Sequence, residues 1–518
     1  MPAADRHESL DPATGRVVGA VTLTPPEEVA SVVASAAAVQ PLWAQLRPAH
    51  RARYMVRAAQ AVIDELADLR VLIARETGRP LVEAESLEIL PAIETLRWLA
   101  EDGPGILGDD RVDLSRTFFP RKRARVTHAP LGVVAVISPA ADPFAQPLGD
   151  VAIALMAGNA VVLKPSPLAA LCGERILRAF TRAGLPEGLL RVVHGGSATG
   201  RALVAAPVDL VRLAGSAEVG REVGEACARD LKASTLALAG NDAALVLDDA
   251  PLDRAIAGLT WAAFANAGQS AGSAERVYVA RALHDRFVAG VVARARALRV
   301  GSPLAPATEV GPLASEARAE RVRALIADAV ERGAVLACGS SAGEGAFVQP
   351  TVLTHVPGDA PVLREEVPGP VLCVAAVDSL EEAIARANDA ELGLGASVWT
   401  ADRARGARIA KALHAGMVWI NDHQVAPIAP QLPWGGVKGS GLGRVRGEAA
   451  LRTCVTDTVI TWDPPGGREP WWHPYDASLL RAGEAMAWLR SGRDRDRSRA
   501  WREHPLPVAR VARRALRR

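Results

Sequence analysis

Hydrophobic and polar residues follow two different periods along this chain. From about Pro25 to Ala100, alanine-rich stretches place apolar residues three to four positions apart, which predicts helices. From Leu131 onward the pattern changes to short β-branched runs separated by segments of helix length, which predicts parallel strands connected by helices. The runs of this first series are LGVVAVISP (131–139), NAVVLKPS (159–166), LRVVHGG (190–196), VDLVRLAGS (208–216) and AALVLDD (243–249).

A second series of runs predicts a second α/β unit. Its members are ERVYVA (275–280), AVLACG (334–339), GPVLCVAAV (369–377), GASVWT (395–400) and GMVWIN (416–421). The segment 116–127 (RTFFPRKRARVT) alternates without helical spacing, and we expect it to form a β-ribbon. The strand pattern ends near Trp462.

The C-terminal segment has an amphipathic pattern of its own. We expect Asp476 to cap a helix with one apolar face, and we expect a second apolar stripe flanked by arginines near the end. The residues of these two faces are Leu479, Ala482, Met486 and Leu489, and Val508, Val511, Ala512, Ala515 and Leu516. Such a basic stretch suits an anionic membrane surface or an acidic partner, but we give more weight to packing on its own subunit or fraying.

Composition narrows the class of protein. The 518 residues include 49% hydrophobic and 23% charged residues, and 60 basic against 58 acidic side chains give a net charge of +2. This balance argues against a nucleic-acid partner, although 13 arginines against 6 acids after Asp463 make the tail basic. Five scattered cysteines without a CxxC motif predict neither a disulfide framework nor a metal site. Without a signal-peptide pattern or a long apolar run, we expect a cytoplasmic protein, with peripheral membrane association through the tail as an alternative.

Two segments are candidates for binding phosphate groups. Gly215, Ser216 and Gly220 lie between a predicted strand and a helix, where backbone N–H groups can hold a pyrophosphate. Because the spacing is GSxxxG and not GxGxxG, the motif alone is weak, and the glycines could serve only the turn. Lys164 lies at the end of a predicted strand, where open α/β sheets bind ligands, but a solvated lysine is the more common case.

A serine-hydrolase pattern also occurs, at Gly268-Gln269-Ser270-Ala271-Gly272. This motif requires a strand before the serine and a helix after it. Here a helical stretch precedes Ser270 and the strand-like ERVYV follows it, so we disfavour the hydrolase interpretation.

Eleven segments, in their order and spacing, resemble the aldehyde dehydrogenase superfamily over about Leu10 to Trp462. They are DPATGRVVG (11–19), LGVVAVISP (131–139), GNAVVLKPS (158–166), GLPEGLLRVVHG (184–195), GSAEVG (215–220), NAGQ (266–269), ERVYV (275–279), VGPL (310–313), QPTVL (349–353), REEVPGPV (364–371) and PWGGVKGSGLGR (433–444). The resemblance implies an α/β fold with three parts. We expect an NAD(P)-binding Rossmann-like domain (1–111 and 131–239), a catalytic-type α/β domain (240–440) and an oligomerisation β-ribbon (112–130 and 454–463), followed by a basic extension (464–518).

The family reaction is the NAD(P)-dependent oxidation of an aldehyde to an acid through a covalent thioester. It uses a cysteine nucleophile, a glutamate base and an asparagine that stabilises the oxyanion. On the matching motifs these positions are Ala271, Ala237 and Ala141. No catalytic side chain is therefore intact. Removing a nucleophile costs about a millionfold in rate and one oxyanion donor about a hundred- to a thousandfold, so we expect family-type catalysis to be lost.

The resemblance leaves the cofactor site more complete. Lys164 matches the lysine that contacts the adenosine ribose, Gly215 and Ser216 match the pyrophosphate turn, and Glu366 matches the glutamate on the nicotinamide ribose. Pro167 replaces an acid that favours NAD over NADP, and Pro368 replaces a phenylalanine near the nicotinamide. We expect NAD or NADP to bind weakly.

Three functions compete. The first is a catalytically silent subunit that binds or assembles, as a homo-oligomer or as a hetero-oligomer with an active paralogue. The second is a residual oxidoreductase in which a hydrated aldehyde transfers hydride directly, with Asp142 as a candidate base. The third is a membrane-surface protein that uses the arginine-rich tail. Decay of an active ancestor, a role that never needed the aldehyde site, and deliberate inactivation all remain open.

Overall fold

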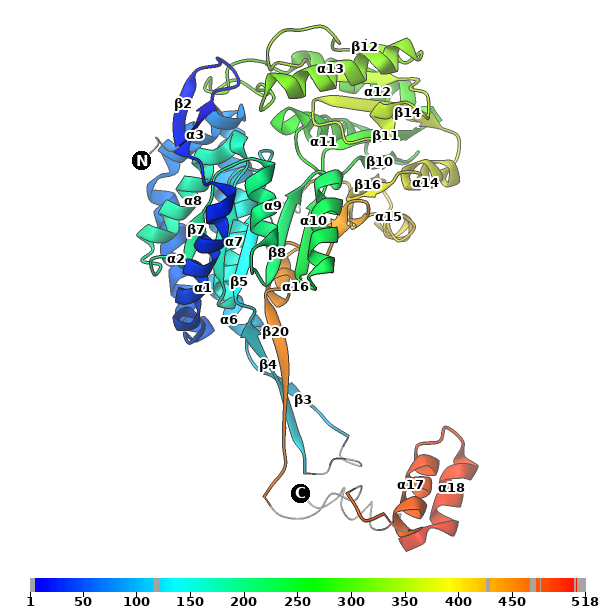
Figure 1. The fold of residues 1–518 in the computed structure, drawn as a ribbon. Helices are drawn as coiled ribbons and strands as arrows, with labels where there is room; N and C mark the ends of the chain where they lie inside the picture. Colours follow the sequence, from blue (N-terminus) through cyan, green and yellow to red (C-terminus); the bar gives the residue numbers. More distant parts are fainter. Residues whose placement is uncertain are drawn as a thin grey trace. The chain divides into compact units, whose positions relative to one another are not determined.

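The computed structural model describes residues 5–115, 119, 121–424, 429–465, 472–475, 477–506 and 509. They form two compact units, one made of Met1–Leu107 and Pro130–Thr456 and the other of Gly108–Ala129 and Asp457–Arg518. The larger unit contains a six-stranded and a seven-stranded sheet, each with its own covering helices (Figure 1). The boundary between two domains near residue 240 stays a prediction, because both sheets fall in this one unit.

The N-terminal part of the larger unit is an antiparallel hairpin followed by helices, as the helical spacing predicts. The hairpin is β1 (Arg6–Leu10) and β2 (Val17–Thr22). The helices are η1 (Pro26–Glu28), α1 (Val29–Ala44), α2 (Pro48–Asp64), α3 (Leu66–Thr77), α4 (Leu81–Glu83), the π-helix η2 (Ala84–Ile89), α5 (Leu90–Glu101) and α6 (Gly103–Ile106). Gly78 ends α3 with a left-handed φ of 82°, and the following Arg79 enters the interior.

The six-stranded sheet has the order β19-β9-β8-β5-β6-β7 and is parallel except for β19. Its strands are β5 (Val133–Ile137), β6 (Ala160–Lys164), β7 (Leu190–Val192), β8 (Leu210–Gly215), β9 (Ala233–Leu238) and β19 (Gly441–Leu442). Its helices are α7 (Ala145–Ala157), η3 (Pro167–Ala169), α8 (Ala170–Arg182), α9 (Ser197–Ala205) and α10 (Ala217–Arg229). The sequence pattern missed β9 (ASTLAL), because small and polar residues interrupt its apolar run.

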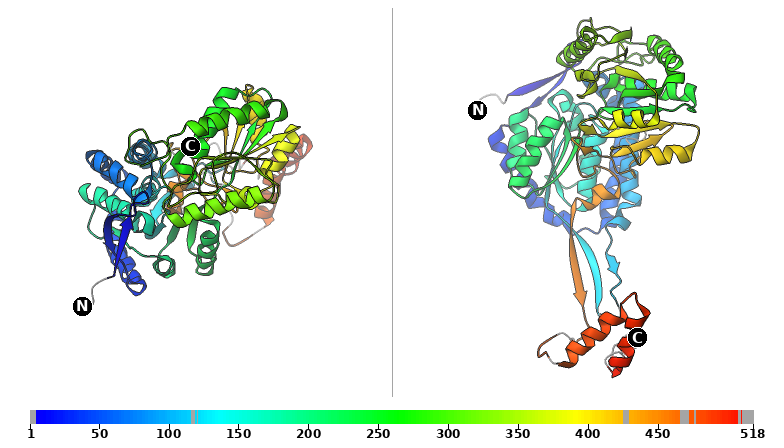
Figure 2. Two further views of the ribbon diagram at one scale, coloured as in Figure 1. Left: turned by 90° about the horizontal axis from the view of Figure 1, so that it is seen from above. Right: turned by 90° about the vertical axis from the view of Figure 1, so that its right-hand side faces the viewer.

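The seven-stranded sheet has the order β12-β13-β14-β11-β10-β16-β17, with only β12 antiparallel. Its strands are β10 (Asp242–Val246), β11 (Ala274–Ala280), β12 (Val335–Cys338), β13 (Thr351–Thr354), β14 (Val371–Val377), β16 (Gly395–Trp399) and β17 (Met417–Ile420). Its helices are α11 (Leu252–Phe264), η4 (Ala265–Gly268), α12 (Arg281–Ala297), α13 (Glu316–Glu331), η5 (Pro361–Leu363), α14 (Leu380–Asn388) and α15 (Arg403–Ala410). Helices pack on both faces (Figure 2), and the run 243–249, which follows the first series along the chain, pairs here with β11 and β16.

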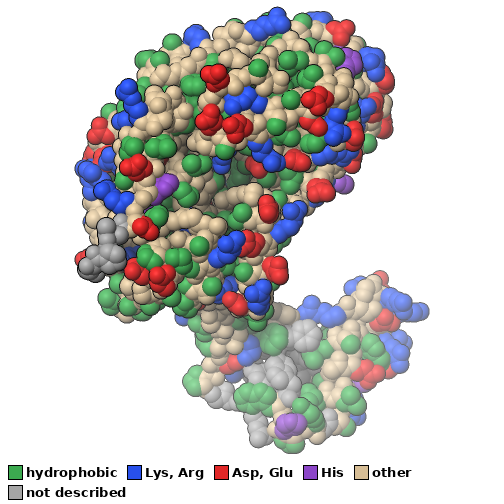
Figure 3. Space-filling view, turned by 45° about the horizontal axis from the view of Figure 1, so that its top comes forward, with side chains coloured by type: hydrophobic (Ala, Val, Ile, Leu, Met, Phe, Trp, Pro, Cys, Tyr) green, Lys and Arg blue, Asp and Glu red, His purple; other side chains and the backbone are tan. Residues whose placement is uncertain are grey.

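Short elements complete the larger unit. The strands β15 (Leu392–Gly393) and β18 (Val437–Lys438) pair with each other, and α16 (Gly447–Arg452) packs on α7. Among the described residues, no single helix is long and apolar enough to cross a membrane, although the bent pair Pro26–Ala44 and Pro48–Asp64 meets that test by length and composition. Acidic and basic side chains are interspersed on the face shown in Figure 3.

The smaller unit combines a three-stranded ribbon with a helical hairpin. The ribbon strands are β3 (Asp110–Val112), β4 (Arg123–Pro130) and β20 (Val455–Trp462), in the order β20-β4-β3. The ribbon is thus confirmed at residues 123–127, whereas 116–118 and 120 lie outside the described residues. The predicted tail helix is α17 (Ala477–Leu489), and the sequence pattern did not show α18 (Asp494–Glu503), which packs on it through Ala485 and Ala500. Asp476 and the second stripe from Val508 also lie outside the described part.

Candidate functional site

The loop that carries the nucleophile position keeps a strained backbone. In η4, Asn266 and Ala267 have left-handed φ angles of 52° and 51°, a conformation that costs an alanine roughly 1–2 kcal/mol. Gly268, the next residue, also has a positive φ angle. Ala271 follows before β11 and is half-buried. Helix α11 precedes Ser270 and strand β11 follows it, so the strand-to-helix turn that a serine hydrolase needs is absent from this segment.

Ala237 and Ala271 belong to one apolar cluster. Ala237 is the last residue but one of β9 and is 7% exposed, and Ala271 packs against the same cluster. The other members are Ala214, Leu394, Met417, Trp419, Trp434 and Val445. A Cβ atom on Gly272 would come within 2.9 Å of the Trp434 ring, so this indole lies directly against the residue after the nucleophile position. Apolar side chains therefore pack around Ala237 and Ala271, two of the three positions that the family resemblance assigns to catalysis.

Ala141, the oxyanion position, is tied to the same loop through its backbone. The side-chain amide of Asn266 donates to the Ala141 carbonyl oxygen at 3.0 Å, and the Arg79 guanidinium donates to that oxygen at 2.6 Å. Arg79 is 2% exposed and also pairs with Glu88 at 3.0 Å and with Asp142 at 3.1 Å. The structure thus brings Ala141 to the loop of Ala271 while leaving no donor side chain at the oxyanion position.

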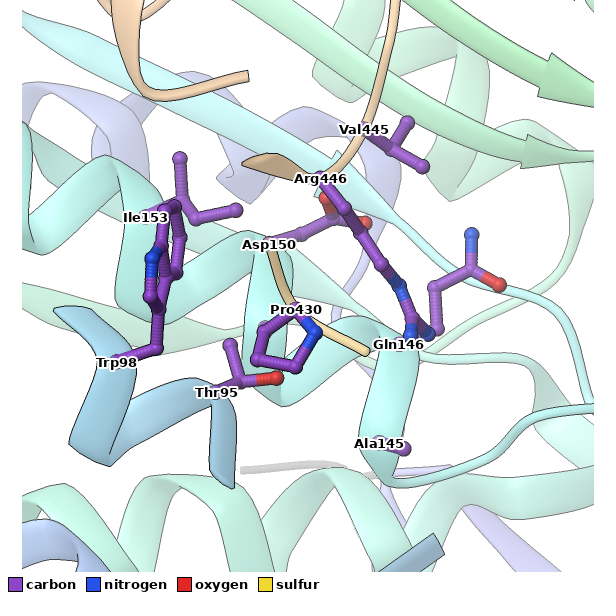
Figure 4. Close-up of a pocket in the computed structure, with 10 residues that line it drawn as sticks. Thr95, Trp98, Ala145, Gln146, Asp150, Ile153, Pro430, Val445 and Arg446 are labelled. Atoms are coloured by element: carbon purple, nitrogen blue, oxygen red, sulfur yellow. The ribbon is translucent and has the colours of Figure 1, made fainter. Parts of the chain in front are cut away.

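A very small cavity shares one residue, Val445, with the apolar cluster, but none of Ala141, Ala237 and Ala271 lines it. It has a volume of about 10 Å³ and lies between α5, α7 and the segment from Pro430 to Arg446 (Figure 4). Figure 4 shows the Arg446 side chain between Asp150 and Gln146, while Val445 belongs to both the cavity wall and the apolar cluster. A space of this size accommodates about one water molecule.

An unexpected buried polar pair lies beside the cluster. Asp242 and His423 are 1% exposed, and the Oδ2 and Nε2 atoms that face each other are 4.0 Å apart without a hydrogen-bond partner. The His423 Nδ1 atom is 2.9 Å from Ser397 Oγ, and Asp242 Oδ1 accepts from the Gly395 N–H. Burial raises the pKa of Asp242 to about 7 and lowers the pKa of His423 to about 4. Both groups are therefore largely uncharged at mildly acidic pH.

Lys164, Gly215 and Ser216, three of the residues predicted to bind a cofactor, lie where strands β6 and β8 of the six-stranded sheet end. Lys164 ends β6 and is 6% exposed; among the described residues its side chain donates to the Pro165 carbonyl at 3.3 Å, and burial lowers its pKa to about 8. Ser216 caps α10, accepting from the Val219 N–H at 3.3 Å. A Cβ atom on Gly215 would meet nothing closer than 3.9 Å, so the turn leaves its backbone open to a ligand.

Gly220 and Glu366 have different surroundings. A Cβ atom on Gly220 would lie 2.3 Å from Leu238 Cδ1, which explains this glycine by the packing of α10 on β9. Glu366 is half-buried, and burial raises its pKa while Arg318 and Arg321 lower it. Pro167 begins η3, and its backbone carbonyl oxygen lies 2.8 Å from His7 Nε2. The proline ring carries no polar group that could bind a ribose hydroxyl.

No cysteine takes over the role of the missing thiol. Cys172, Cys227, Cys338, Cys373 and Cys454 are all buried, and burial raises the pKa of each of these thiols. A high pKa disfavours the thiolate that attacks carbonyl carbons. The described residues also contain no cluster of three or more His, Cys, Asp or Glu side chains that could hold a metal ion.

Comparison with known proteins identifies the family of this chain. The aldehyde dehydrogenase family model matches residues 1–460. The chain belongs to the aldehyde dehydrogenase family. It is 37% identical over 450 residues to betaine aldehyde dehydrogenase 1 of Rhizobium meliloti (strain 1021), covering 86% of this chain and 91% of that protein. It is 38% identical over 458 residues to betaine aldehyde dehydrogenase of Cereibacter sphaeroides, covering 88% and 93%.

Solved structures of family members share the fold. An aldehyde dehydrogenase of Mycobacterium tuberculosis, complexed with NAD+, has a TM-score of 0.85 and 33% identity over 90% of this chain and 96% of that one. An NADP-dependent enzyme of E. coli also has a TM-score of 0.85 and 33% identity, over 89% and 95%. These likenesses confirm the predicted family and its α/β fold.

Sequence reasoning missed several residues of this site. Arg79 lies between Gly78 and Pro80, where the sequence predicts only a break between helices. Its charge was the only feature that could have indicated a role in the site. Trp434 belonged to a recognised motif, but its contact with Gly272 depends on tertiary packing. Asp242 and His423 are 181 positions apart in the sequence, and nothing in the local pattern connects them.

Proposed function

We propose that this family member binds NAD or NADP weakly but does not oxidise aldehydes through a thioester, and that it acts as a binding or assembly subunit. The observation that carries this proposal is the apolar cluster around Ala237 and Ala271. A methyl group at each position can neither attack a carbonyl nor accept a proton.

The cofactor part of the proposal rests on the open turn at Gly215 and on Lys164. The first turn of α10 presents backbone N–H groups that can bind a pyrophosphate, and Ser216 fixes the start of this helix. Lys164, which has only a backbone partner, is available to a ribose hydroxyl. Glu366 would hold the nicotinamide ribose. When bound, NAD(P) supplies a hydride acceptor. Proline in place of the acid at position 167 and of the phenylalanine at position 368 accounts for the weak affinity that we propose.

The residual oxidoreductase is the less favoured alternative. It requires a base near the aldehyde, and Asp142 is the nearest candidate in the sequence. In the structure the Asp142 carboxylate is engaged in an ion pair with Arg79 at 3.1 Å. Direct hydride transfer would also lack a donor for the developing oxyanion.

An assay of NADH and NADPH production tests the proposal. The untagged chain is incubated with betaine aldehyde and simple aliphatic aldehydes beside the variant Ala271→Cys/Ala237→Glu/Ala141→Asn. We expect no turnover by the native chain and measurable turnover by the variant, provided that circular dichroism shows it folded. Turnover by the native chain with either cofactor would refute the proposal.

Two binding measurements test its other parts. Isothermal titration with millimolar NAD and NADP should give heat that Lys164→Met reduces, and the absence of any heat would refute cofactor binding. Affinity purification of the native chain from its own cells should recover an aldehyde dehydrogenase paralogue or further copies of itself. Recovery of a monomer alone would count against the assembly role.

A further inference from the structure

A cavity that none of the predicted catalytic or cofactor-binding residues lines lies beside α11. Its volume is about 570 Å³, within the range of about 300–1,000 Å³ that small-molecule sites occupy. Its walls come from α4 and η2, from α11, from the end of α12 and from the loop before Val310. All of these segments belong to the larger unit.

The walls of this cavity are mainly apolar and aromatic. Trp261 and Phe264 contribute from α11, Leu87 from η2, and Leu298 and Val310 from the segment after α12. Trp261 is a 41% exposed side chain of α11. An exposed indole at a concave surface is suited to stack on or cover an apolar ligand.

The hydroxyl groups around the cavity are already engaged within the protein. Ser86 donates to the Val82 carbonyl at 2.8 Å, Thr260 to Ile256 at 2.6 Å, and Thr308 to Ser302 at 2.7 Å. Each hydroxyl has only one proton to donate. A sugar or polyol would therefore find few free donors here.

The charged groups leave one cation unpaired. Arg299 is held by Glu309 at 3.3 Å, whereas Arg294, which lines the cavity, makes no ion pair or hydrogen bond within the described part of the chain. Glu83 accepts from the Asn266 N–H at 2.8 Å, and burial raises its pKa to about 7, which reduces its repulsion of an anion near neutral pH. One free guanidinium matches one carboxylate. A phosphate dianion would meet the acidic Glu309 and Glu83 without a second free cation.

We propose that this cavity binds a small organic monocarboxylate with an aromatic or branched apolar body. The carboxylate pairs with Arg294, and the apolar body lies against Trp261, Leu87 and Leu298. None of Ala141, Ala237 and Ala271 lines this cavity, and the proposal does not depend on whether those positions are active.

Calorimetry and ligand-observed NMR on the full chain test the proposal. The probes are phenylacetate, indole-3-acetate and isovalerate, each compared with its neutral amide and, for the first, with phenethylamine. We expect the carboxylates to bind at least tenfold more tightly than the amides and the amine not to bind. If none of the three carboxylates binds at about 10 mM, which is far above most ligand dissociation constants, the proposal is wrong.

Three variants locate the binding. Arg294→Gln should weaken carboxylate binding at least tenfold, and Ala257→Phe, at a half-buried lining position, should abolish it by filling the cavity. Arg286→Gln, at an exposed position on the same helix but outside the cavity, is the matched control and should leave binding unchanged. Equal binding by all three variants, each shown to be folded by its thermal melting curve, would place the carboxylate elsewhere and overturn the proposal.

Discussion

At the scale of single residues, the missing thiol has a consequence that labelling can measure. All five cysteines are buried, so the folded chain should react with a thiol reagent such as 5,5′-dithiobis(2-nitrobenzoate) only on unfolding. Ala271→Cys should add one rapidly reacting thiol, because residue 271 is half-buried at the surface of the apolar cluster. Ser270→Cys, also half-buried, is the control for exposure alone. A native chain that reacts as fast as Ala271→Cys would contradict the assignment.

The buried Asp242–His423 pair predicts how stability depends on pH. Burial raises the pKa of Asp242 from 3.8 to about 7, so its contribution to the free energy of unfolding is lost as pH rises from about 3.8 to about 7. Burial lowers the pKa of His423 from 6.5 to about 4, so its contribution to the free energy of unfolding increases as pH rises from about 4 to about 6.5. Asp242→Asn keeps an acceptor for the Gly395 N–H but cannot ionise. We expect the free energy of unfolding of this variant, relative to that of the native chain, to increase by roughly 1–4 kcal/mol from pH 5 to pH 8. Urea unfolding at both pH values measures this gain, with the exposed Asp253→Asn as control, and an equal effect at both would refute it.

At the scale of elements, helix α10 offers a matched pair of glycines. A Cβ atom at Gly220 would lie 2.3 Å from Leu238 Cδ1, whereas one at Gly224 would lie 3.3 Å from Leu236 Cδ1. We expect Gly220→Ala to destabilise the chain by about 1–3 kcal/mol through overpacking. Gly224→Ala should change stability by less, because helix propensity favours alanine by about 1 kcal/mol. Similar urea midpoints for the two variants would contradict the packing role of Gly220.

The same elements show what the sequence could and could not predict. Strands β5 and β6 are confirmed, because strands buried on both faces carry continuous apolar runs that are visible locally. Strand β8 is also confirmed, although Arg212 interrupts its apolar run. Strand β9, which carries Ala237, was missed because small and polar residues interrupt its apolar run. The positions Ala141, Ala237 and Ala271 could be found only by resemblance. Their packing with Trp434 and their link through Asn266 depend on tertiary contacts that no local pattern encodes.

At the scale of the whole molecule, the two compact units suggest that the C-terminal extension contributes little to the main fold. The large hydrophobic clusters of the first unit contain no residue beyond Val455, and α17 and α18 bury Ala485 and Ala500 against each other. Deleting residues 464–518 leaves the ribbon strand β20 intact. We expect calorimetry to show the main unfolding transition of the truncated chain within about 2 °C of the full chain, since a change of 1 kcal/mol would shift it by only a few degrees. A larger drop would show that the extension stabilises the main unit.

Intact-mass spectrometry tests the central claim most directly. The native chain is incubated with an aldehyde and NAD, or with NADP, and quenched in acid, which preserves thioesters. The predicted result is the mass of the unmodified chain, while Ala271→Cys treated in the same way gains the mass of an acyl group. An acyl adduct on the native chain, mapped to any residue near Ala271, would contradict the account.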